Sequence, residues 1–373
     1  MWWKRRTYLD YAAGVSGNPS SPHEEGRRAR HIVEDARTVI ARLVEVQNDD
    51  VIFTSGATES NALAILGVVR ARRELAGPDT AGRNNMHVLY LPSAHASIVE
   101  NMKVLAAEGV TVGALPIKEY RVDIEALATM IRPETVLVSM DAVCGETGVV
   151  WNTREVKQTI GNIFLHTDAS QAPLTEKISR AHFGADLLTL DGSKVGVRGI
   201  GVIIAHRTIP IVPLYKGGGQ ERGLRSGSEA PELAQSFARS LTTVVSSREA
   251  FRATAEKERT ILIKKIIKDI PNVSIQEGRH QAPNILNLSL LGRDTDYLVA
   301  LLDEEGFAIS TRSACETDSE AGSRAVFALT GDPARARTTL RISWGHSIRS
   351  RELAHFVRAL VRTVAFIDSN SQR

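Results

Sequence analysis

Short apolar segments alternate with amphipathic ones between Val51 and Ala205, and this alternation constrains the fold more than any other feature. Helical stretches are predicted from His23 to about Val46 and at about 95–107, 123–130, 153–161 and 172–182. Strands are predicted at Val51–Thr54, His87–Leu91, Val110–Ala114, Val136–Ser139, Phe164–Thr167, Leu187–Leu190 and Val202–Ala205. Strands that are apolar throughout and separated by helices indicate an α/β fold with a mainly parallel seven-stranded sheet, covered on both faces. The last strand follows its neighbour too closely for a crossover helix, so we expect it to be antiparallel.

The pattern changes after residue 231. A long, mostly helical stretch covers 231–269, and beyond it come short strands and helices, predicted at Ile285–Leu290, about 294–305, Ala308–Ser310, Thr339–Ser343 and about 349–366. A chain of 373 residues is expected to form two domains. We therefore predict an N-terminal segment, 1–13, that packs with the small domain, a large ligand-binding domain, 14–247, and a smaller α+β domain, 248–373.

Charge and composition exclude several classes of protein. The net charge is only +3 and no basic patch is interleaved with aromatic residues, so we expect no direct binding of nucleic acid. No apolar run reaches the length of a membrane span, and the first residues lack the apolar core of a signal peptide. The two cysteines, Cys144 and Cys315, favour a reducing cytoplasm over a disulfide framework. Closely spaced Cys/His pairs are missing, so no metal is expected.

Several polar residues follow directly after predicted strands, where open α/β sheets bind their ligands. Lys194 stands in a glycine-rich turn, where a partly desolvated amine can lose its proton and attack a carbonyl. Taken alone, a surface lysine is the simpler interpretation. Asp168 ends another strand and could keep a heteroaromatic nitrogen protonated or simply cap a helix. His95, after a third strand, could stack on a planar ligand, shuttle a proton or be a bystander in its loop.

Two glycine-containing turns are candidates for binding an anion. Ser55-Gly56-Ala57-Thr58 lies between a strand and a helix, where free N–H groups and a hydroxyl suit a phosphate. It lacks the lysine of a P-loop, and a plain helix N-cap explains it as well. The run Gly217–Ser228 is unusually dense in glycine, and the two arginines and the glutamate within it favour a shaped binding loop over a flexible linker.

Two more candidates lie towards the carboxyl terminus. Cys315 is part of the polar loop Ser310–Ser319, where an exposed thiol is more often reactive than a buried one. Arg341 lies inside the apolar segment Leu340–Ser343. A buried guanidinium needs an anionic partner, which could be a substrate carboxylate or a structural carboxylate of the chain.

Taken in order, these motifs resemble those of the cysteine desulfurases, pyridoxal-phosphate enzymes of the class V aminotransferase family, over nearly the whole chain. The motifs that carry the resemblance are Tyr8–Ala13, Gly17–Ser21, Phe53–Asn61, Gly145–Val149, His166–Gln171, Gly217–Ser228, Ser313–Cys315 and Leu340–Ser343. The resemblance implies the fold type I of pyridoxal-phosphate-dependent transferases. It also implies an enzyme that removes sulfur from L-cysteine, releases L-alanine and passes an enzyme persulfide to a sulfur-acceptor protein, either an iron–sulfur scaffold or a tRNA-thiolation protein.

The resemblance assigns a role to each matching residue around the cofactor ring. Lys194 would hold pyridoxal 5'-phosphate as a Schiff base and later move protons. Asp168 would pair with the pyridine nitrogen and make the ring an electron sink. Gln171 would contact the ring hydroxyl, and His95 would stack on the ring face and assist proton transfer.

The resemblance also implies how the phosphate and the substrate are bound. Thr58, the backbone around Gly56 and Ala57, and Ser193 would hold the phosphate. Ser228 would reach the phosphate of the neighbouring subunit, so a homodimer is expected. For the substrate, Arg341 would bind the carboxylate of cysteine and Cys315 would attack its sulfur.

The sequence departs from the family pattern in four places, one of which is Ala94-His95, where the family has Glu-His. Ser193 stands where the family has a histidine before the cofactor lysine, and the segment between Ala13 and Gly17 is short. Cys144-Gly145 replaces paired asparagines and removes an amide expected near the cofactor hydroxyl and the substrate carboxylate. Gln171 and Arg341 would then carry more of that work. These departures keep two alternatives open: a selenocysteine or sulfinate lyase of the same fold, and a degenerate member that serves as a scaffold for sulfur-relay partners.

Overall fold

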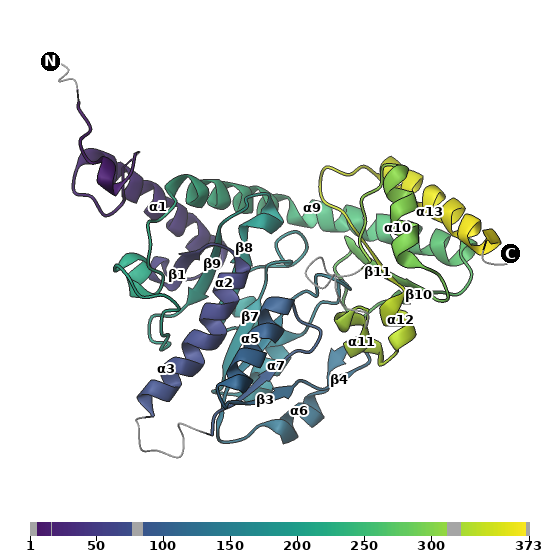
Figure 1. Cartoon of the computed structure of the whole chain (residues 1–373), viewed down its shortest axis with the longest axis horizontal. Coiled ribbons are helices and arrows are strands. Elements are labelled where there is room, and N and C mark those ends of the chain that lie inside the picture. Colours follow the sequence, from purple (N-terminus) through teal and green to yellow (C-terminus); the bar gives the residue numbers. More distant parts are fainter. Residues whose placement is uncertain (1–5, 16, 77–84, 312–321, 371–373) are drawn as a thin grey trace.

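The computed structural model describes residues 6–15, 17–76, 85–311 and 322–370 of the 373-residue chain. A large unit built around a seven-stranded sheet is joined to a smaller unit by one long helix that runs along both (Figure 1). The amino terminus projects from the large unit, whereas the carboxyl terminus lies on the small unit (Figure 1). Within the described ranges, no helix combines the length and the apolar character needed to cross a membrane.

The large sheet has the strand order β1-β9-β8-β7-β6-β2-β3. Its strands are β1 Val51–Thr54, β2 His87–Tyr90, β3 Thr111–Ala114, β6 Thr135–Asp141, β7 Phe164–Asp168, β8 Leu187–Asp191 and β9 Gly201–Ala205. The five strands β2, β3, β6, β7 and β8 are parallel, and β9 is antiparallel to both of its neighbours. The predicted mainly parallel sheet and its antiparallel last strand are therefore confirmed. Because parallel strands share a direction, their carboxyl ends meet at one edge of the sheet.

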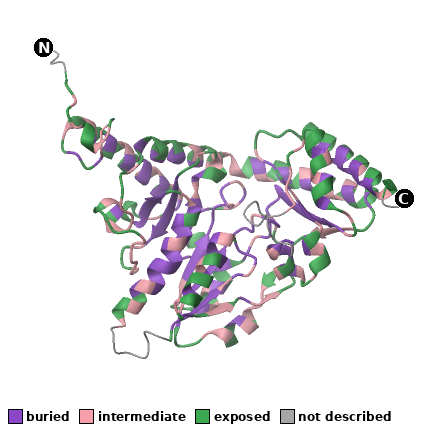
Figure 2. Ribbon diagram, in the orientation of Figure 1, coloured by how far each residue is buried: buried purple, intermediate pink, exposed green. Residues whose placement is uncertain are grey.

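Helices cover both faces of this sheet, as the fully apolar strands predicted. One face carries α1 Glu24–Leu43, α8 Arg180–Phe183 and the first half of α9 Pro231–Asp269. The other face carries α2 Ala57–Ala62, the π-helical turn η3 Leu63–Gly67, α3 Val68–Leu75, α5 Ala96–Ala107, α6 Ile124–Met130 and α7 Thr153–Ile160. Apart from the edge strand β3, the strands are largely buried between these two layers, and the exposed residues of the helices face outward (Figure 2).

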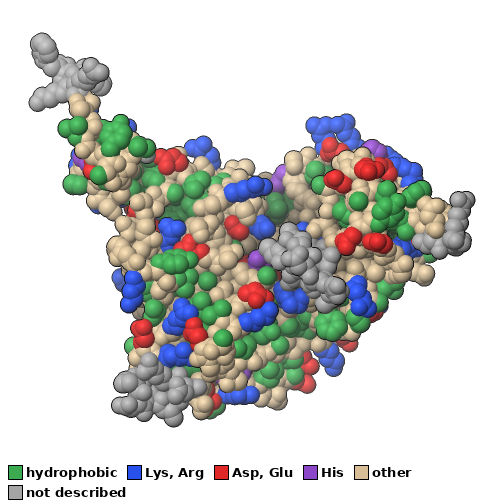
Figure 3. All heavy atoms as spheres, in the orientation of Figure 1, with side chains coloured by type: hydrophobic (Ala, Val, Ile, Leu, Met, Phe, Trp, Pro, Cys, Tyr) green, Lys and Arg blue, Asp and Glu red, His purple; other side chains and the backbone are tan. Residues whose placement is uncertain are grey.

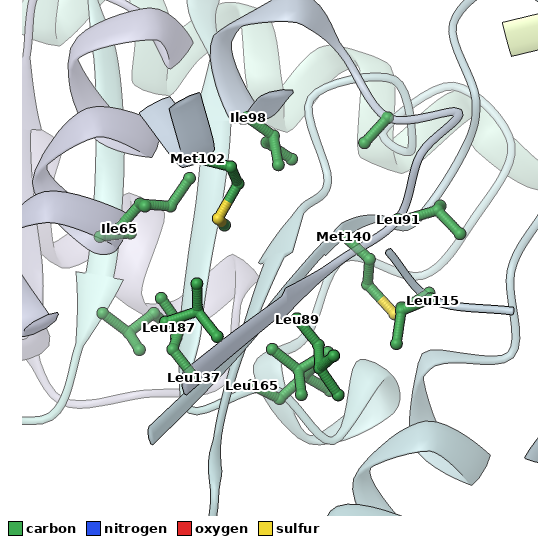
Figure 4. Close-up of a cluster of buried hydrophobic side chains, with 14 of the residues drawn as sticks. Ile65, Leu89, Leu91, Ile98, Met102, Leu115, Leu137, Met140, Leu165 and Leu187 are labelled. Atoms are coloured by element: carbon green, nitrogen blue, oxygen red, sulfur yellow. The ribbon is translucent and has the colours of Figure 1, made fainter. Parts of the chain in front are cut away.

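Large aliphatic side chains form the core under the second layer of helices. Ile65, Ile98 and Met102 project from the helices towards Leu137 and Leu187 on the sheet (Figure 4). Each of these five side chains is 1% exposed or less. Burying a side chain of this size contributes about 1.5–3 kcal/mol to the stability of the fold. This packed layer gives the strand ends a rigid base.

The small unit has a three-stranded antiparallel sheet in the order β10-β11-β12. Its elements are β10 Val273–Gln276, β11 Ile285–Leu290, α10 Thr295–Glu304, α11 Arg324–Thr330, α12 Pro333–Arg337, β12 Thr339–Ser343 and α13 Ser350–Asn370. The second half of α9 packs with α10 and α13 on one core beside this sheet. The predicted α+β character is thus confirmed.

Helix α9 belongs to both cores. Pro231 stands in its first turn, and neither glycine nor proline interrupts the following residues before Pro271, so the helix runs without a break. Phe237 and Leu241 pack in the core of the large unit, whereas Phe251 and Leu262 pack in the core of the small unit. The division of the chain at residue 247 stays a prediction, as does the packing of residues 1–13 with the small domain. In the described chain, Arg6 pairs with Glu24 and Glu25 at the start of α1.

Two local predictions were wrong, and three short strands were missed. Only Arg180–Phe183 of the stretch 172–182 is α-helical, because the Ser179 hydroxyl caps the backbone N–H of His182 and starts the helix there. The predicted strand Ala308–Ser310 is reduced to a single bridge between Ser310 and Arg341. Strand β10 and the two-stranded ribbon of β4 Ile117–Lys118 and β5 Arg121–Val122 were not predicted.

Candidate active site

A cavity of about 130 Å³ lies where the carboxyl ends of the large-sheet strands meet the small unit. Its lining includes Lys194, His95, Gln171 and Arg341, four of the residues singled out in the sequence. The lining is completed by Ser93, Ala94, Ala96, Asp141, Cys144, Gly145, Glu146, Arg324 and Ala325. The structure therefore brings together side chains that are far apart in the sequence, and it draws them from both units.

Lys194 is presented by a tight turn directly after β8. The residues Gly192–Val195 form one 3₁₀ turn, and Asp191 caps it by accepting the N–H of Ser193 at 2.9 Å. A Cβ atom at Gly192 would stand 2.5 Å from the carbonyl oxygen of Val197, so only glycine fits at this position. The turn leaves the side chain of Lys194 exposed at the cavity.

Asp168 lies at the end of β7 and is 6% exposed. Both of its carboxylate oxygens accept hydrogen bonds: Oδ2 from the side-chain amide of Asn61 at 2.7 Å and Oδ1 from the N–H of Ser170 at 2.9 Å. A buried carboxylate with these partners is fixed in orientation, and its hydrogen-bonding needs are met. Such a group can hold a proton on a heteroaromatic nitrogen.

His95 is connected to Asp168 through two side chains. Its Nδ1 accepts a hydrogen bond from the backbone N–H of Ser97 at 3.2 Å, and this bond caps α5. The same nitrogen lies 2.8 Å from the Ser97 hydroxyl oxygen. The amide of Asn61 donates to that hydroxyl at 2.9 Å and to Asp168 with its other hydrogen. Because Nδ1 accepts a hydrogen bond from the backbone, Nε2 is the ring nitrogen left to carry a proton.

Asn61 was not singled out as a site residue in the sequence, although it ends the motif Phe53–Asn61. The signal was its spacing, because Asn61 follows Thr58 by three residues on a helix and so lies on the same face. The spacing did not show that this face of the helix lies towards Asp168. That information comes from the packing of α2 against the sheet.

The turn predicted to hold a phosphate has the expected shape. Gly56 has φ 151°, a conformation that favours glycine, and it starts the helix that contains Ala57 and Thr58. Ser193 lies close by, since the carboxylate of Asp191, which accepts the Ser193 N–H, would be 4.0 Å from a Cβ atom at Gly56. Asp191, which was not a predicted site residue, accepts the backbone N–H of Ser193 in this turn.

The glycine-rich loop is anchored by a buried ion pair. Both carboxylate oxygens of Glu221 accept from the guanidinium of Arg37, at 2.7 and 2.8 Å, and Glu221 also accepts the N–H of Phe53 at 2.8 Å. The loop is thus shaped rather than flexible, as its charged residues suggested. Ser228 does not reach the cavity at Lys194 within one chain; it lines a separate cavity of about 110 Å³ together with Ser55.

Arg341 enters the cavity from β12. Its guanidinium donates to the carbonyl oxygen of Gly145 at 3.3 Å, and its backbone pairs with Ser310. Cys315 lies outside the described residues. Ser310 and Ser323, which precede and follow it in the sequence, both contact residues that line the cavity. The backbone of Ser310 pairs with Arg341, and the hydroxyl of Ser323 donates a hydrogen bond to Glu146.

Comparison with known proteins assigns the family. Residues 6–356 match the aminotransferase class-V family. The chain belongs to this family. Cysteine desulfurase IscS 1 of Archaeoglobus fulgidus is 30% identical over 368 residues, which cover 97% of this chain and 94% of that relative. The NifS/IcsS protein homolog of Lactobacillus delbrueckii is 33% identical, covering 95% of this chain and 91% of that relative. Within the class V aminotransferases, the chain is therefore a member of the cysteine desulfurase group.

Solved structures of the family share the fold. A NifS-like protein superposes with a TM-score of 0.84 at 26% identity, covering 94% of this chain and 92% of its own. The structure of SspA in complex with cysteine superposes with a TM-score of 0.72 at 28% identity, covering 87% and 90%. Members of the family are pyridoxal-phosphate enzymes. The residues present fit that cofactor, since a buried, doubly hydrogen-bonded Asp168 lies behind the cavity that holds Lys194 and His95.

The departures from the family pattern at Cys144 and Gly145 have a structural explanation. A Cβ atom at Gly145 would stand 2.8 Å from Nε2 of Gln171, so the glycine makes room for the Gln171 amide. Cys144 is buried, with its sulfur 3.8 Å from the carbonyl oxygen of Ser93. Burial, together with the charge of Asp141, raises the pKa of the Cys144 thiol to about 12. The thiol therefore stays protonated and unreactive, although it does line the cavity.

Proposed function

We propose that this protein is a pyridoxal-phosphate-dependent cysteine desulfurase that converts L-cysteine to L-alanine and leaves a persulfide on Cys315. The observation that carries the proposal is the cavity at the strand ends, which joins Lys194, His95, Gln171 and Arg341. Membership of the cysteine desulfurase family supports the same activity. The solved complex of the related SspA with cysteine supports L-cysteine as the substrate.

When bound, pyridoxal phosphate supplies an electron sink for the bonds around the substrate's α-carbon. The chain holds and orients it. Lys194, which lines the cavity, would attach it covalently, and the carboxylate of Asp168, fixed by Asn61, would hold a proton on the ring nitrogen. Gln171 would contact the ring hydroxyl. The turn of Gly56, Ala57 and Thr58 would bind the phosphate with Ser193.

Three side chains act on the substrate. Arg341 binds the carboxylate of cysteine with its guanidinium, which the small unit presents at the cavity. His95 and Lys194 carry protons, and Nε2 of His95 is the ring nitrogen available for this because Nδ1 is engaged with Ser97.

Cys315 takes the sulfur. Its thiolate attacks the sulfur of the substrate, so that an S–S bond forms as the substrate's C–S bond breaks. The electron pair of the broken bond stays with the carbon, which takes up a proton and becomes the methyl group of alanine. No external oxidant is needed, because the electron pair that the sulfur loses on reaching the persulfide level is the pair that reduces the carbon to a methyl group.

The proposal includes a homodimer in which Ser228 of one subunit reaches the phosphate held by the other. In support, Ser228 is exposed and separate from the cavity of its own chain. The N-terminal projection also exposes Leu9, Tyr11 and Val15, which are 88%, 67% and 77% accessible (Figure 3). The sulfur acceptor, an iron–sulfur scaffold or a tRNA-thiolation protein, and action in the cytoplasm remain predictions.

The test uses the purified protein loaded with pyridoxal phosphate. It should be yellow, and Lys194→Ala should remove the visible absorption of the covalently attached cofactor. L-Cysteine with a reductant should give alanine and sulfide in equal amounts. Without reductant, the chain should gain the mass of one sulfur atom, and Cys315→Ala should abolish both that mass and the alanine.

The same variants separate the alternatives. Alanine formed from selenocysteine or a sulfinate by Cys315→Ala would contradict the desulfurase mechanism and favour the lyase. A wild-type protein that binds no cofactor would contradict any activity of this kind and favour the scaffold.

A further inference from the structure

A second aspartate lies beside Asp168 and has no part in the function proposed above. Asp141 ends β6, and its Cα is the direct partner of the Asp168 Cα across the β6–β7 pairing. The two residues are 4% and 6% exposed. Their side chains leave the same face of the sheet, since directly paired residues of neighbouring strands point the same way. Asp141, however, lines the cavity that Lys194 lines.

The two carboxyl groups have different surroundings. Both oxygens of Asp168 accept hydrogen bonds, from Asn61 and Ser170. Oδ1 of Asp141 is buried and has no hydrogen-bond partner in the described parts of the chain. A buried ionised oxygen without a partner is costly, so this carboxyl group needs either a proton or a ligand that contacts it.

Charged groups surround Asp141 from every element at the cavity. Asp168 lies on β7, Lys194 follows β8, Arg324 starts α11, Arg341 lies on β12, and His95 and Glu146 lie in the loops after β2 and β6. Burial and the charge of Asp168 raise the pKa of Asp141 to about 8, and Arg324 acts in the opposite direction. At neutral pH the carboxyl group therefore carries a proton and is a hydrogen-bond donor.

The loop after β6 lacks the amide donor that the family pattern places there. Cys144 and Gly145 stand where the family has paired asparagines, so the amide expected near the cofactor hydroxyl is absent. The Cys144 thiol lies against the carbonyl oxygen of Ser93, and Gly145 has no side chain. Of the lining residues on β6 and the loop directly after it, Asp141 can supply a hydroxyl proton from the same stretch of chain, three residues before Cys144.

We propose that Asp141 contacts the bound cofactor and donates its carboxyl proton in a hydrogen bond to the ring oxygen, alongside Gln171. This inference rests on the function proposed above. It assigns two roles to two neighbouring carboxyl groups: ionised Asp168 serves the ring nitrogen, and neutral Asp141 serves the ring oxygen. The hydrogen bond exists only while Asp141 is protonated. When Asp141 loses its proton the bond is lost, and the visible spectrum of the holoprotein therefore depends on pH.

Two variants of the holoprotein test the inference. Asp141→Asn keeps a donor of the same size but cannot ionise, whereas Asp141→Leu removes the donor. The visible spectrum is recorded between about pH 6 and about pH 10, a range that brackets the raised pKa, and the dissociation constant for pyridoxal phosphate is measured by titration. Asp186→Asn is the matched control. Asp186 directly precedes β8, at the end of the strand opposite to Lys194, and it accepts hydrogen bonds from Lys157 and from the N–H of Leu165.

In the wild type, the spectrum should change as the pH rises through the raised pKa of Asp141. Asp141→Asn should keep the wild-type spectrum at neutral pH and lose this transition. Asp141→Leu should shift the absorption band at neutral pH and raise the dissociation constant about tenfold, the effect of one hydrogen bond to a charged oxygen. Asp186→Asn should match the wild type in its spectrum at neutral pH, in the pH-dependent transition and in the dissociation constant.

A wild-type transition that persists in Asp141→Asn would overturn the inference, and so would an Asp141→Leu protein with the wild-type spectrum and affinity. If Asp141→Leu does not fold, the transition in Asp141→Asn still decides. A purely structural role for Asp141 would change the unfolding midpoint without moving the spectrum. A wild-type protein that binds no pyridoxal phosphate would overturn the proposed function as well, whereas an active, yellow wild type with unaffected Asp141 variants would overturn the inference alone.

Discussion

Arg37 on α1 and Glu221 in the glycine-rich loop form a buried, two-pronged ion pair that ties the loop to the first strand of the large sheet. Arg37 also donates to the carbonyl oxygen of Val51, and Glu221 accepts the N–H of Phe53. Glu221 and Arg222 have positive φ angles of 48° and 59°, a strained backbone that this pairing holds in place. The loop that carries Ser228 therefore depends on a contact far from it in the sequence.

Glu221→Gln should destabilise the protein strongly, because it removes the buried carboxylate that binds Arg37 with both oxygens and leaves the exposed Glu34 as the remaining counterion of that guanidinium within the described residues. We expect the free energy of unfolding to fall by about 3–5 kcal/mol. Denaturant unfolding followed by circular dichroism measures the change. Glu34→Gln is the matched control: Glu34 pairs with the same arginine, but its side chain is 52% exposed, so the loss should be below about 1 kcal/mol. Equal losses in the two variants would contradict the anchoring role.

Asn61→Leu should weaken the binding of pyridoxal phosphate, because it removes the donor that fixes Asp168 and the donor that contacts Ser97. One hydrogen bond to a carboxylate corresponds to a rise of about 10–100-fold in the dissociation constant. Titration of the cofactor, followed by visible absorption, gives this constant. Asn101→Leu is the control, since Asn101 donates only to the backbone of Ser97. An unchanged constant in Asn61→Leu would show that Asp168 needs no such support.

Gly145→Ala should displace Gln171, because the new Cβ would stand 2.8 Å from its Nε2. The backbone of Gly145 has no positive φ, so the steric contact with Gln171 decides the outcome. The same substitution in a Gln171→Ala background should have a smaller effect on cofactor affinity. The coupling energy from this double-mutant cycle should be at least about 0.5 kcal/mol. Additive effects would mean that the two residues do not compete for space.

Asp141→Asn should change how the stability of the cofactor-free protein depends on pH. The folded state keeps the proton of Asp141 up to about pH 8, whereas the unfolded chain loses it near pH 3.9. Between these values the folded protein binds the extra proton, so its stability falls by about 1.4 kcal/mol per pH unit as the pH rises and levels off above the folded pKa. The variant lacks this loss.

The difference in unfolding free energy between Asp141→Asn and the wild type should therefore grow in favour of the variant from about pH 5 to about pH 8. Denaturant midpoints at several pH values measure it. Asp186→Asn provides the comparison for a partly buried aspartate that is paired with a lysine. A difference that stays constant over this range would show that Asp141 is already ionised in the folded protein.

The sheet was predictable because its signal is local. Strands that are buried on both faces must be apolar at every position, as in Val202–Ala205, and this run stands out without knowledge of its neighbours. The stretch 172–182 failed for the opposite reason. Its apolar residues Ala172 and Ile178 are fully buried, but in an irregular segment whose shape is set by contacts with other elements.

The site was predictable in part. Residues that follow strands, such as Asp168 and Lys194, could be placed at one edge of the sheet because parallel strands end together. The pairing of Asp141 with Asp168 could not be foreseen, since it depends on the register between β6 and β7. The contact of Asn61 with Asp168 likewise depends on how α2 packs against the sheet.

The sequence by itself determined the order of the elements, the family motifs and the types of side chain available for chemistry, because each of these is written in neighbouring residues. Only the tertiary structure decided which side chains meet. It brought Arg341 of the small unit to the same cavity as Lys194 and His95 of the large unit, and it buried one oxygen of Asp141 with no hydrogen-bond partner among the residues that the structure describes. The physical reason is that hydrogen bonding, desolvation and charge act over a few ångströms in space, whatever the separation along the chain.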